Sequence, residues 1–181
     1  MASTCRNYEI NQWSKILIHG GAGGIGSIAI QLAKHLGAYV ATTVSTNDIQ
    51  FVKEELGADE AIDYKTQKFE DVLPHDFDAV FDTVGGETYT RSFKVLKRGG
   101  GGIIISMLEQ PVQELMDQFG VKAVFVFSQG NRERLTKLAE WVDQNNIRVN
   151  VERTFPLDEA RAALDYQIDV HPRGKIVLAT Q

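Results

Sequence analysis

The sequence contains a single cysteine, Cys5, and no apolar run near the roughly 20 residues that a membrane-spanning helix requires. One cysteine excludes an internal disulfide and a cysteine-based zinc cluster. Chains without disulfides are typical of reducing compartments. We therefore expect a cytoplasmic protein that has no membrane partner.

Positive charge is also scarce. Lys and Arg number 19 against 24 Asp and Glu, which gives a formal net charge of -5. Without a basic run or a basic patch interleaved with aromatic residues, the sequence gives no reason to expect a nucleic-acid partner. The 43% hydrophobic and 24% charged residues are typical of a globular domain, and 181 residues suffice for one domain with extensions.

Short apolar runs alternate with helical patterns from about residue 14 to residue 146. Because these runs are apolar at consecutive positions, they predict strands covered by helices on both faces. The alternation predicts an α/β fold with a Rossmann-type, doubly wound parallel sheet of strand order 3-2-1-4-5-6. The expected strands are 15–19, 38–44, 60–63, 77–82, 103–106 and 121–127, and the expected helices are 25–36, 48–56, 87–96 and 131–142.

Two of these helices have apolar residues at helical spacing, and we expect the stripe of the second to face the core. In the last helix, Asn131 is the expected N-cap. The first stripe consists of Ile25, Ile28, Ala29, Leu32 and Leu36, and the second of Leu135, Leu138, Ala139 and Val142.

Residues 147–181 break the alternation. Ile147, Val149 and Val151 alternate with polar residues, which predicts a strand with one wet face. A short helix over 158–166 and a β-rich run over 174–179 follow. We expect domain boundaries of 14–146 for the dinucleotide-binding domain and 147–181 for a tail that belongs to a different sheet.

The glycine-rich segment after the first strand fits G-x-G-x-x-G at Gly21, Gly23 and Gly26. A strand before the motif and a helix after it are the context of a dinucleotide pyrophosphate site. The helix N-terminus adds unpaired N–H donors for the phosphates. A glycine turn without a ligand is the structural alternative, whereas a P-loop is excluded because no G-K-[S/T] follows.

The end of the second strand bears on the choice of dinucleotide. NAD-specific sites place an acid there, and we expect none, since Asp48 comes late and within the next helix. Ser45, Thr46 and Asn47 could instead donate to a 2′-phosphate, although no Arg or Lys is evident at the site. NADP(H) is therefore preferred over NAD(H), and a plain helix cap over 45–47 is the alternative.

The segments ILIHGGAGGIGSIAIQLAKHLGAYV, LGADEAIDY, FDAVFDTVGG and FPLDEARAALDYQIDVHPRGKIVL together resemble the medium-chain dehydrogenase/reductase superfamily. The resemblance covers about residues 14–181 and is closer to the zinc-independent quinone oxidoreductase branch, which includes zeta-crystallin-like enzymes. It implies hydride transfer from NADPH to a quinone or to an activated alkene or carbonyl substrate. The tail would then pack on a largely missing GroES-like domain.

The resemblance also implies which residues bind the cofactor. The pyrophosphate would lie on Gly23, Gly24 and Ile25, within the loop bounded by Gly21 and Gly26. The 2′-phosphate would lie near Ser45 and Tyr64, although Ile49 stands where many relatives have a lysine. Thr83 and Val84 would line the cofactor near its ribose. Ser106, Met107 and the segment from Phe125 to Phe127 would approach the nicotinamide, or would only pack the strand ends.

Catalytic residues and metal ligands are not identified by the sequence. Four histidines, His19, His35, His75 and His171, lie at spacings that fit no metal site. His19 ends the first strand and has either a structural role or a cofactor contact. We name no catalytic acid or base, because hydride transfer is the chemistry of the cofactor.

The missing domain implies a fragment, a truncated product or one part of a split enzyme, with little or no activity of its own. A non-catalytic dinucleotide-binding or dimerisation protein is the alternative, and a methyltransferase is a third. Relatives pair their cofactor domains through the last strand of the sheet. The resemblance therefore implies a homodimer through residues 121–127, with a small molecule as the substrate.

Overall fold

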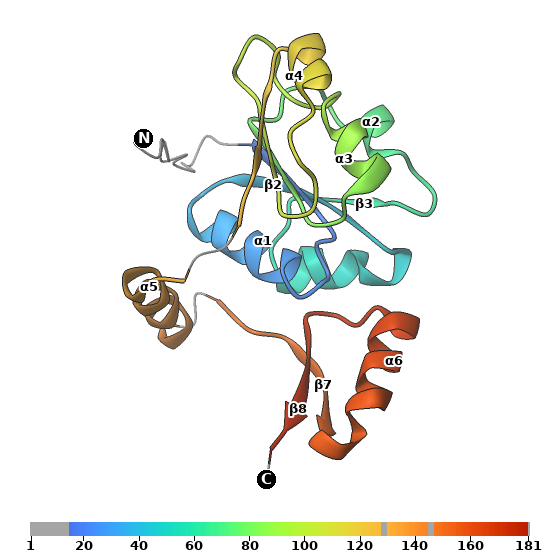
Figure 1. Ribbon diagram of the computed structural model, residues 1–181, viewed down its shortest axis with the longest axis vertical. Helices are drawn as coiled ribbons and strands as arrows, with labels where there is room; N and C mark the ends of the chain where they lie inside the picture. Colours follow the sequence, from blue (N-terminus) through green and yellow to red (C-terminus); the bar gives the residue numbers. More distant parts are fainter. Residues whose placement is uncertain (1–14, 128–129, 145–146, 181) are drawn as a thin grey trace.

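The computed structural model describes residues 15–127, 130–144 and 147–180; Cys5 and position 14 lie outside these ranges. A six-stranded parallel sheet lies in the upper part of the molecule in Figure 1. It has the predicted order β3-β2-β1-β4-β5-β6. All six carboxyl ends therefore meet at one edge, where α/β proteins bind ligands. The strands are β1 (Lys15–His19), β2 (Tyr39–Val44), β3 (Glu60–Asp63), β4 (Ala79–Asp82), β5 (Ile103–Ser106) and β6 (Lys122–Phe125).

Helices connect the strands and cover the sheet on both faces. In place of the single helix predicted over 48–56, the chain forms a 3₁₀ turn (Thr46–Asp48) followed by a π-helical segment (Phe51–Glu55). A helix that we did not predict, α4, packs Leu115, Met116 and Phe119 on the core. The α-helices are α1 (Gly26–His35), α2 (Phe69–Val72), α3 (Gly86–Ser92), α4 (Gln113–Phe119), α5 (Arg132–Asp143) and α6 (Ala160–Val170).

The core consists of two apolar clusters, one on each face of the sheet. The first packs β1, β2 and the π-helical segment against α1, and Ile30 and Val52 are completely buried in it. The second includes residues of α2 and α3, and Phe77, Phe93 and Leu96 are completely buried there. Burial of this many large side chains stabilises the sheet by about 2 kcal/mol for each.

The apolar residues whose spacing predicted α1 do not form its buried face. Ile30 and Ala33 are buried, whereas Ile25 and Leu36 are exposed and Ile28 and Leu32 are partly exposed. Gly26 lies against the Gly20 carbonyl, so the start of the helix is close to the loop. Apolar spacing alone therefore identified this helix but does not identify its buried face.

The predicted stripe of α5 does not enter the core either. Asn131 does cap the helix, because its side chain accepts a 2.8 Å hydrogen bond from Arg134 N. Leu135, however, is 61% exposed, and Leu138 and Val142 also lie on the surface. The helix is set apart from the sheet in Figure 1, and its Trp141 ring stacks near His35 of α1, at 5.3 Å between centroids.

The C-terminal residues form a second, two-stranded parallel sheet of β7 (Val151–Pro156) and β8 (Lys175–Ala179). A 3₁₀ turn (Leu157–Glu159) and α6 connect the two strands. The strand predicted over 147–152 begins later than expected, at Val151, and both Val149 and Val151 are exposed. Within the described ranges, no helix is long and apolar enough to cross a lipid bilayer.

Candidate dinucleotide site

The glycine loop joins β1 to α1 at the carboxyl edge of the sheet. Gly20 has a positive φ of 67°, and Gly23 N donates to Gly20 O at 3.0 Å, which makes the turn. A Cβ at Gly26 would overlap the Gly20 carbonyl, and one at Gly21 would overlap Thr42 Oγ1. The loop therefore forms a backbone cradle with no room for side chains at these glycines, as a pyrophosphate site requires.

The N–H donors of this loop are available at the start of α1. The first hydrogen bond of the helical ladder runs from Ser27 N to Gly23 O at 3.0 Å. The N–H groups of Gly24, Ile25 and Gly26 precede it, so they stand at the open, electropositive end of a ten-residue helix. These are the donors that an anionic diphosphate would accept from.

The C-terminal segment closes on this loop. Gly174 N donates to Ala22 O at 2.8 Å, so the start of β8 is tied to the middle of the loop. A Cβ at Gly24 would stand 2.8 Å from Lys175 Nζ, which places that ammonium group over the helix N-terminus. The sequence gave no signal for this contact, because β8 follows the loop by most of the chain length.

His19, at the end of β1, supports the glycine loop through its contacts with Thr43 and Ser92. Its Nδ1 lies 3.0 Å from Thr43 Oγ1, which also accepts from Gly20 N at 3.3 Å, and its Nε2 lies 2.9 Å from Ser92 Oγ. The ring is completely buried, and this desolvation lowers the pKa of the imidazole to about 4. Of the two alternatives for His19, the structure supports the structural role.

Ser45 and Tyr64 lie at the adjacent ends of β2 and β3, where Tyr64 N donates to Val44 O at 3.1 Å. The Tyr64 side chain is exposed. Ser45 Oγ donates to Asp48 Oδ2 at 2.6 Å, because the 3₁₀ turn brings Asp48 back to the strand end. The expectation that no acid stands at this end of β2 is therefore wrong.

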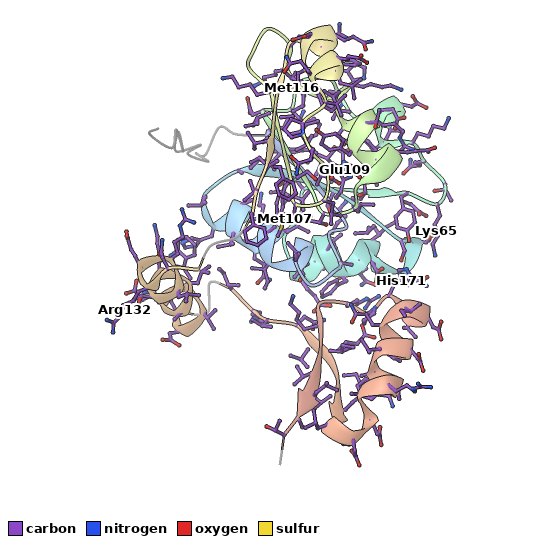
Figure 2. The ribbon with its side chains drawn as sticks, viewed as in Figure 1. Lys65, Met107, Glu109, Met116, Arg132 and His171 are labelled. Atoms are coloured by element: carbon purple, nitrogen blue, oxygen red, sulfur yellow. The ribbon has the colours of Figure 1, made fainter. Side chains whose placement is uncertain are left out.

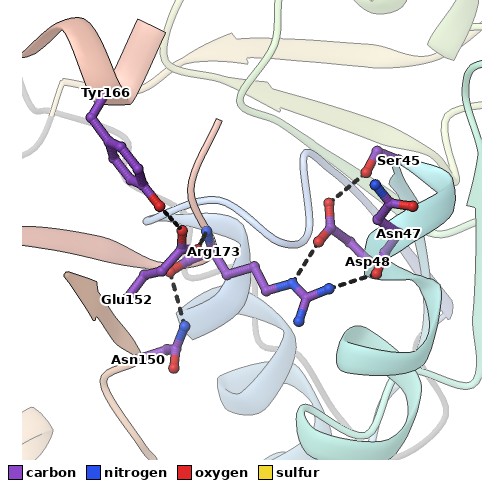
Figure 3. Close-up of polar contacts among 7 residues, drawn as sticks. All are labelled: Ser45, Asn47, Asp48, Asn150, Glu152, Tyr166 and Arg173. Atoms are coloured by element: carbon purple, nitrogen blue, oxygen red, sulfur yellow. Dashed lines mark hydrogen bonds and ion pairs between the residues drawn. The ribbon is translucent and has the colours of Figure 1, made fainter. Parts of the chain in front are cut away.

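A cation also reaches this position. Arg173 Nε donates to Asp48 Oδ1 at 2.7 Å, and Arg173 Nη2 donates to Asn47 O at 2.6 Å (Figure 3). Arg173 follows Asp48 by 125 residues, so no local pattern could have located it. A cationic side chain thus reaches the turn beside Ile49, but it comes from the C-terminal segment and not from the position where many relatives have a lysine.

Thr83 and Val84 flank the glycine loop on its other side. Thr83 Oγ1 donates to His19 O at 2.8 Å and would lie 3.0 Å from a Cβ at Gly20, while the Val84 side chain is exposed. Ser106 is completely buried, and its hydroxyl donates to Asp82. Its side chain thus matches the packing alternative.

The remaining predicted residues follow β5 and β6. Met107 is partly buried, and Figure 2 shows it with Glu109 at the end of the sheet nearest the C-terminal segment. Phe125 lies at the end of β6, and Phe127 beyond it is 78% exposed. The structure therefore brings all of the predicted residues to one edge of the sheet, with Phe125 and Phe127 at its margin.

The described residues do not form a metal site. Among 15–127, 130–144 and 147–180, no three His, Cys, Asp or Glu side chains are grouped so that they could hold an ion. A catalytic zinc needs three protein ligands and an open position. This part of the chain does not fit zinc, and its glycine cradle fits a dinucleotide.

Comparison with known proteins agrees with the fold and the cradle. A family model described as "Zinc-binding dehydrogenase" matches residues 56–178, which is more than half of the chain. The chain is 37% identical to 2-methylene-furan-3-one reductase of Solanum lycopersicum over 90% of its own length and 39% of that protein. It is 34% identical to the chloroplastic NADPH-dependent alkenal/one oxidoreductase of Arabidopsis thaliana, over 94% of its own length and 42% of that protein.

Solved structures give the same result. The quinone oxidoreductase of Coxiella burnetii superposes with a TM-score of 0.86 at 34% identity, over 94% of this chain and 54% of that one. The Escherichia coli quinone oxidoreductase complexed with NADPH gives 0.84 at 27%, over 97% and 60%. The chain spans less than two thirds of each of these relatives. It belongs to the zinc-binding dehydrogenase family of the medium-chain dehydrogenase/reductase superfamily and corresponds to the cofactor-binding half of its quinone and alkenal oxidoreductases.

Proposed function

We propose that the chain is the NADP(H)-binding part of an oxidoreductase that transfers hydride to a quinone or to an activated alkene or carbonyl substrate. The observation that carries the proposal is the glycine cradle at the start of α1, over which Lys175 places a cation. An open helix N-terminus with a nearby ammonium group is suited to a diphosphate. The names of the relatives, which include quinone and NADPH-dependent alkenal/one oxidoreductases, supply the reaction class.

The pyrophosphate would lie on Gly23, Gly24 and Ile25 and would be held by the N–H groups of Gly24 and Ile25 and by Lys175 Nζ. Gly21 and Gly26 would act by leaving the backbone close enough for these contacts, since a Cβ at either would overlap its neighbours. Because the start of β8 is bonded to Ala22, the C-terminal segment would cover the diphosphate from the solvent side.

The two ends of the dinucleotide would extend along the carboxyl edge of the sheet. Ser45 and Tyr64, at the ends of β2 and β3, are proposed for the 2′-phosphate of the adenosine. Thr83 and Val84 are proposed for the region near the ribose. Three residues at the ends of β5 and β6 are proposed for the nicotinamide side: Met107, Phe125 and Phe127. Ser106, the last residue of β5, would support this side through its hydrogen bond to Asp82.

Bound NADPH would supply the hydride, and the substrate would take up one proton for each hydride. The residues of this chain would bind and orient the cofactor and limit the access of water to it. Asp82 and Ser106 would act indirectly, by fixing the loops after β4 and β5. We propose a zinc-independent reaction, because quinone and alkene reduction by hydride needs no Lewis acid and the described residues do not fit zinc.

We further propose that the 14–146 segment is the cofactor domain and that 147–181 packs on a GroES-like substrate domain. The exposed apolar residues of the tail, including Val149, Val151 and Leu178, support this second proposal. Activity of the present chain alone should then be weak or absent. The single cysteine supports the cytoplasm as its compartment, which cell fractionation with an antibody would test.

A homodimer is proposed through the segment 121–127. β6 is the edge strand of the sheet, and Phe125, Val126 and Phe127 are exposed there. Unpaired apolar edge strands are prone to pair with another chain. The exposed stripe of α5 adds apolar surface next to this segment in the sequence.

Titration calorimetry with NADPH and NADH, followed by turnover assays with a panel of quinones and enones, tests the proposed function. Saturable NADPH binding with weak turnover is the expected result. Absence of binding by either dinucleotide would contradict it. Saturable binding without turnover, even after a GroES-like domain of a relative is joined to the chain, would favour the non-catalytic alternative.

A further inference from the structure

Arg173 is held at the dinucleotide site by its backbone. Its carbonyl accepts from Asn150 Nδ2 at 2.9 Å, and its neighbour Gly174 donates to Ala22 O of the glycine loop at 2.8 Å. Lys175 N then donates to Asn150 O at 2.8 Å. The main chain at Arg173 is therefore fixed on both sides, and only the side chain is free to change its partner.

The side chain of Arg173 is bound to the turn after β2. Its guanidinium contacts Asp48 Oδ1 and Asn47 O and lies 5.3 Å from the ring centroid of Phe51. The other oxygen of the carboxylate, Asp48 Oδ2, accepts from Ser45 Oγ at 2.6 Å. The Asp48 carboxylate thus accepts hydrogen bonds from both the Ser45 hydroxyl and the Arg173 guanidinium at the end of β2 (Figure 3).

A phosphate can accept the same hydrogen bonds as this carboxylate, and it binds a guanidinium more strongly. Guanidinium binds phosphate through paired hydrogen bonds, and a dianion attracts it more strongly than a single carboxylate charge does. The Arg173 side chain is 40% exposed, so it can leave Asp48 without being withdrawn from a core. In the free chain, the Asp48 carboxylate therefore occupies the hydrogen-bond donors that a bound phosphate would use.

We propose that Arg173 is the residue that selects NADP(H), and that Asp48 holds it in the free chain and yields it to the 2′-phosphate. The inference rests on the proposed function and adds a selection step to the same site. When NAD(H) binds instead, the Asp48–Arg173 pair stays formed and Asp48 accepts from the ribose 2′-hydroxyl, as acids at the end of the second strand do. The pair thus lets one site bind both dinucleotides, and it sets the ratio of the NADPH and NADH affinities.

A purely structural ion pair is the competing explanation, in which Arg173 only attaches the C-terminal segment to the sheet domain. That role would change the binding of both dinucleotides equally, because both need the glycine loop and its cover. A selecting role changes the NADPH to NADH ratio. The ratio, rather than either affinity, therefore separates the two explanations.

The test is calorimetric titration of the 181-residue chain and its variants with NADPH and with NADH. Arg173→Gln should weaken NADPH binding roughly ten- to hundredfold, as loss of a charge-assisted hydrogen bond does, and change NADH binding by less than about threefold. Arg173→Lys should keep part of the preference. Asp48→Asn should strengthen NADPH binding and weaken NADH binding, because the neutral amide competes less for Arg173 and accepts more weakly from the ribose hydroxyl than a carboxylate does.

Arg161→Gln is the matched control, since it removes the same charge from an exposed position on α6, and thermal unfolding of each variant shows that it is folded. Adenosine 2′,5′-bisphosphate and 5′-AMP locate the effect, because only the first carries the 2′-phosphate. Equal loss of both dinucleotides in Arg173→Gln would overturn the inference and leave the proposed function intact. If the unaltered chain binds neither dinucleotide, the proposed function fails and the inference with it.

Discussion

The hydroxyl of Ser106 donates a 2.9 Å hydrogen bond to Oδ2 of Asp82, and both side chains are completely buried. Asp82 Oδ1 accepts from Val84 N at 3.1 Å and from Gly85 N at 2.9 Å. Ser106 Oγ in turn accepts from the N–H groups of the loop after β5. This pair connects two neighbouring strand ends and fixes both loops that follow them.

Asp82→Ala should therefore destabilise the fold and weaken dinucleotide binding. Three donors, of which the Gly85 N–H and the Ser106 hydroxyl make buried hydrogen bonds, would lose their acceptor, which costs on the order of 3 kcal/mol in unfolding free energy. Urea unfolding and NADPH titration would measure the two effects. Asp76→Ala, at an exposed carboxylate, is the control, and similar unfolding curves for the two variants would refute the role given to Asp82.

Gly26→Ala should lower stability and abolish dinucleotide binding. The added methyl group would overlap the Gly20 carbonyl, which is backbone and cannot rotate away. Such overpacking typically costs about 1–3 kcal/mol. Gly130→Ala, which would meet no atom within 4 Å, should unfold and bind like the unaltered chain. Normal NADPH binding by Gly26→Ala would show that the loop is not the cradle.

Acid should destabilise the chain through His19. Its pKa is lowered from 6.5 to about 4 by burial, so the unfolded chain binds a proton in this range and the folded chain does not. The stability contributed by neutral His19 is complete above pH 6.5 and falls as the pH approaches 4, by up to roughly 3 kcal/mol.

Equilibrium unfolding over this pH range, with His19→Asn as the comparison, isolates the effect. The variant loses the contacts to Thr43 and Ser92 and should be less stable near neutrality. Because asparagine does not titrate, its stability should depend less on pH than that of the unaltered chain. A His19 imidazole resonance that titrates near 6.5 in the folded protein would contradict the assignment.

Phe127→Glu should weaken self-association. The residue is 78% exposed just beyond the edge strand β6, where a charge opposes the pairing of two edges. Sedimentation equilibrium should give a larger dimer dissociation constant for this variant. Leu164→Glu, at an exposed position on α6, should leave it unchanged, and an unaltered chain that sediments as a monomer would refute the proposed dimer.

The sheet and its order were predictable because each strand is marked by a local apolar run and each turn by glycine or polar residues. The bounds of β1, β3 and β5 match the prediction. The faces of α1 and α5 were not predictable from spacing, since burial also depends on what lies opposite each stripe. In α5 the apolar side chains of Leu135 and Leu138 have no core opposite them.

The prediction of the candidate site was complete at the glycine loop, but at the adenosine end it missed residues that contact the site. The loop is a contiguous motif with a known chemical use, so its residues could be named directly. Asp48 was placed too far into a helix, because a 3₁₀ turn cannot be told from the first turn of an α-helix by composition. Arg173 and Lys175 reach the site through tertiary structure alone.

The hydrogen bond from Gly174 N to Ala22 O has a consequence for synthesis on the ribosome. Chains emerge from the N-terminus, so all six strands of the large sheet can form before residues 173–175 leave the exit tunnel. Until then the loop lacks its cover, and Asp48 stands without the guanidinium. The proposed cofactor site is therefore complete only after residues 173–175 have left the exit tunnel.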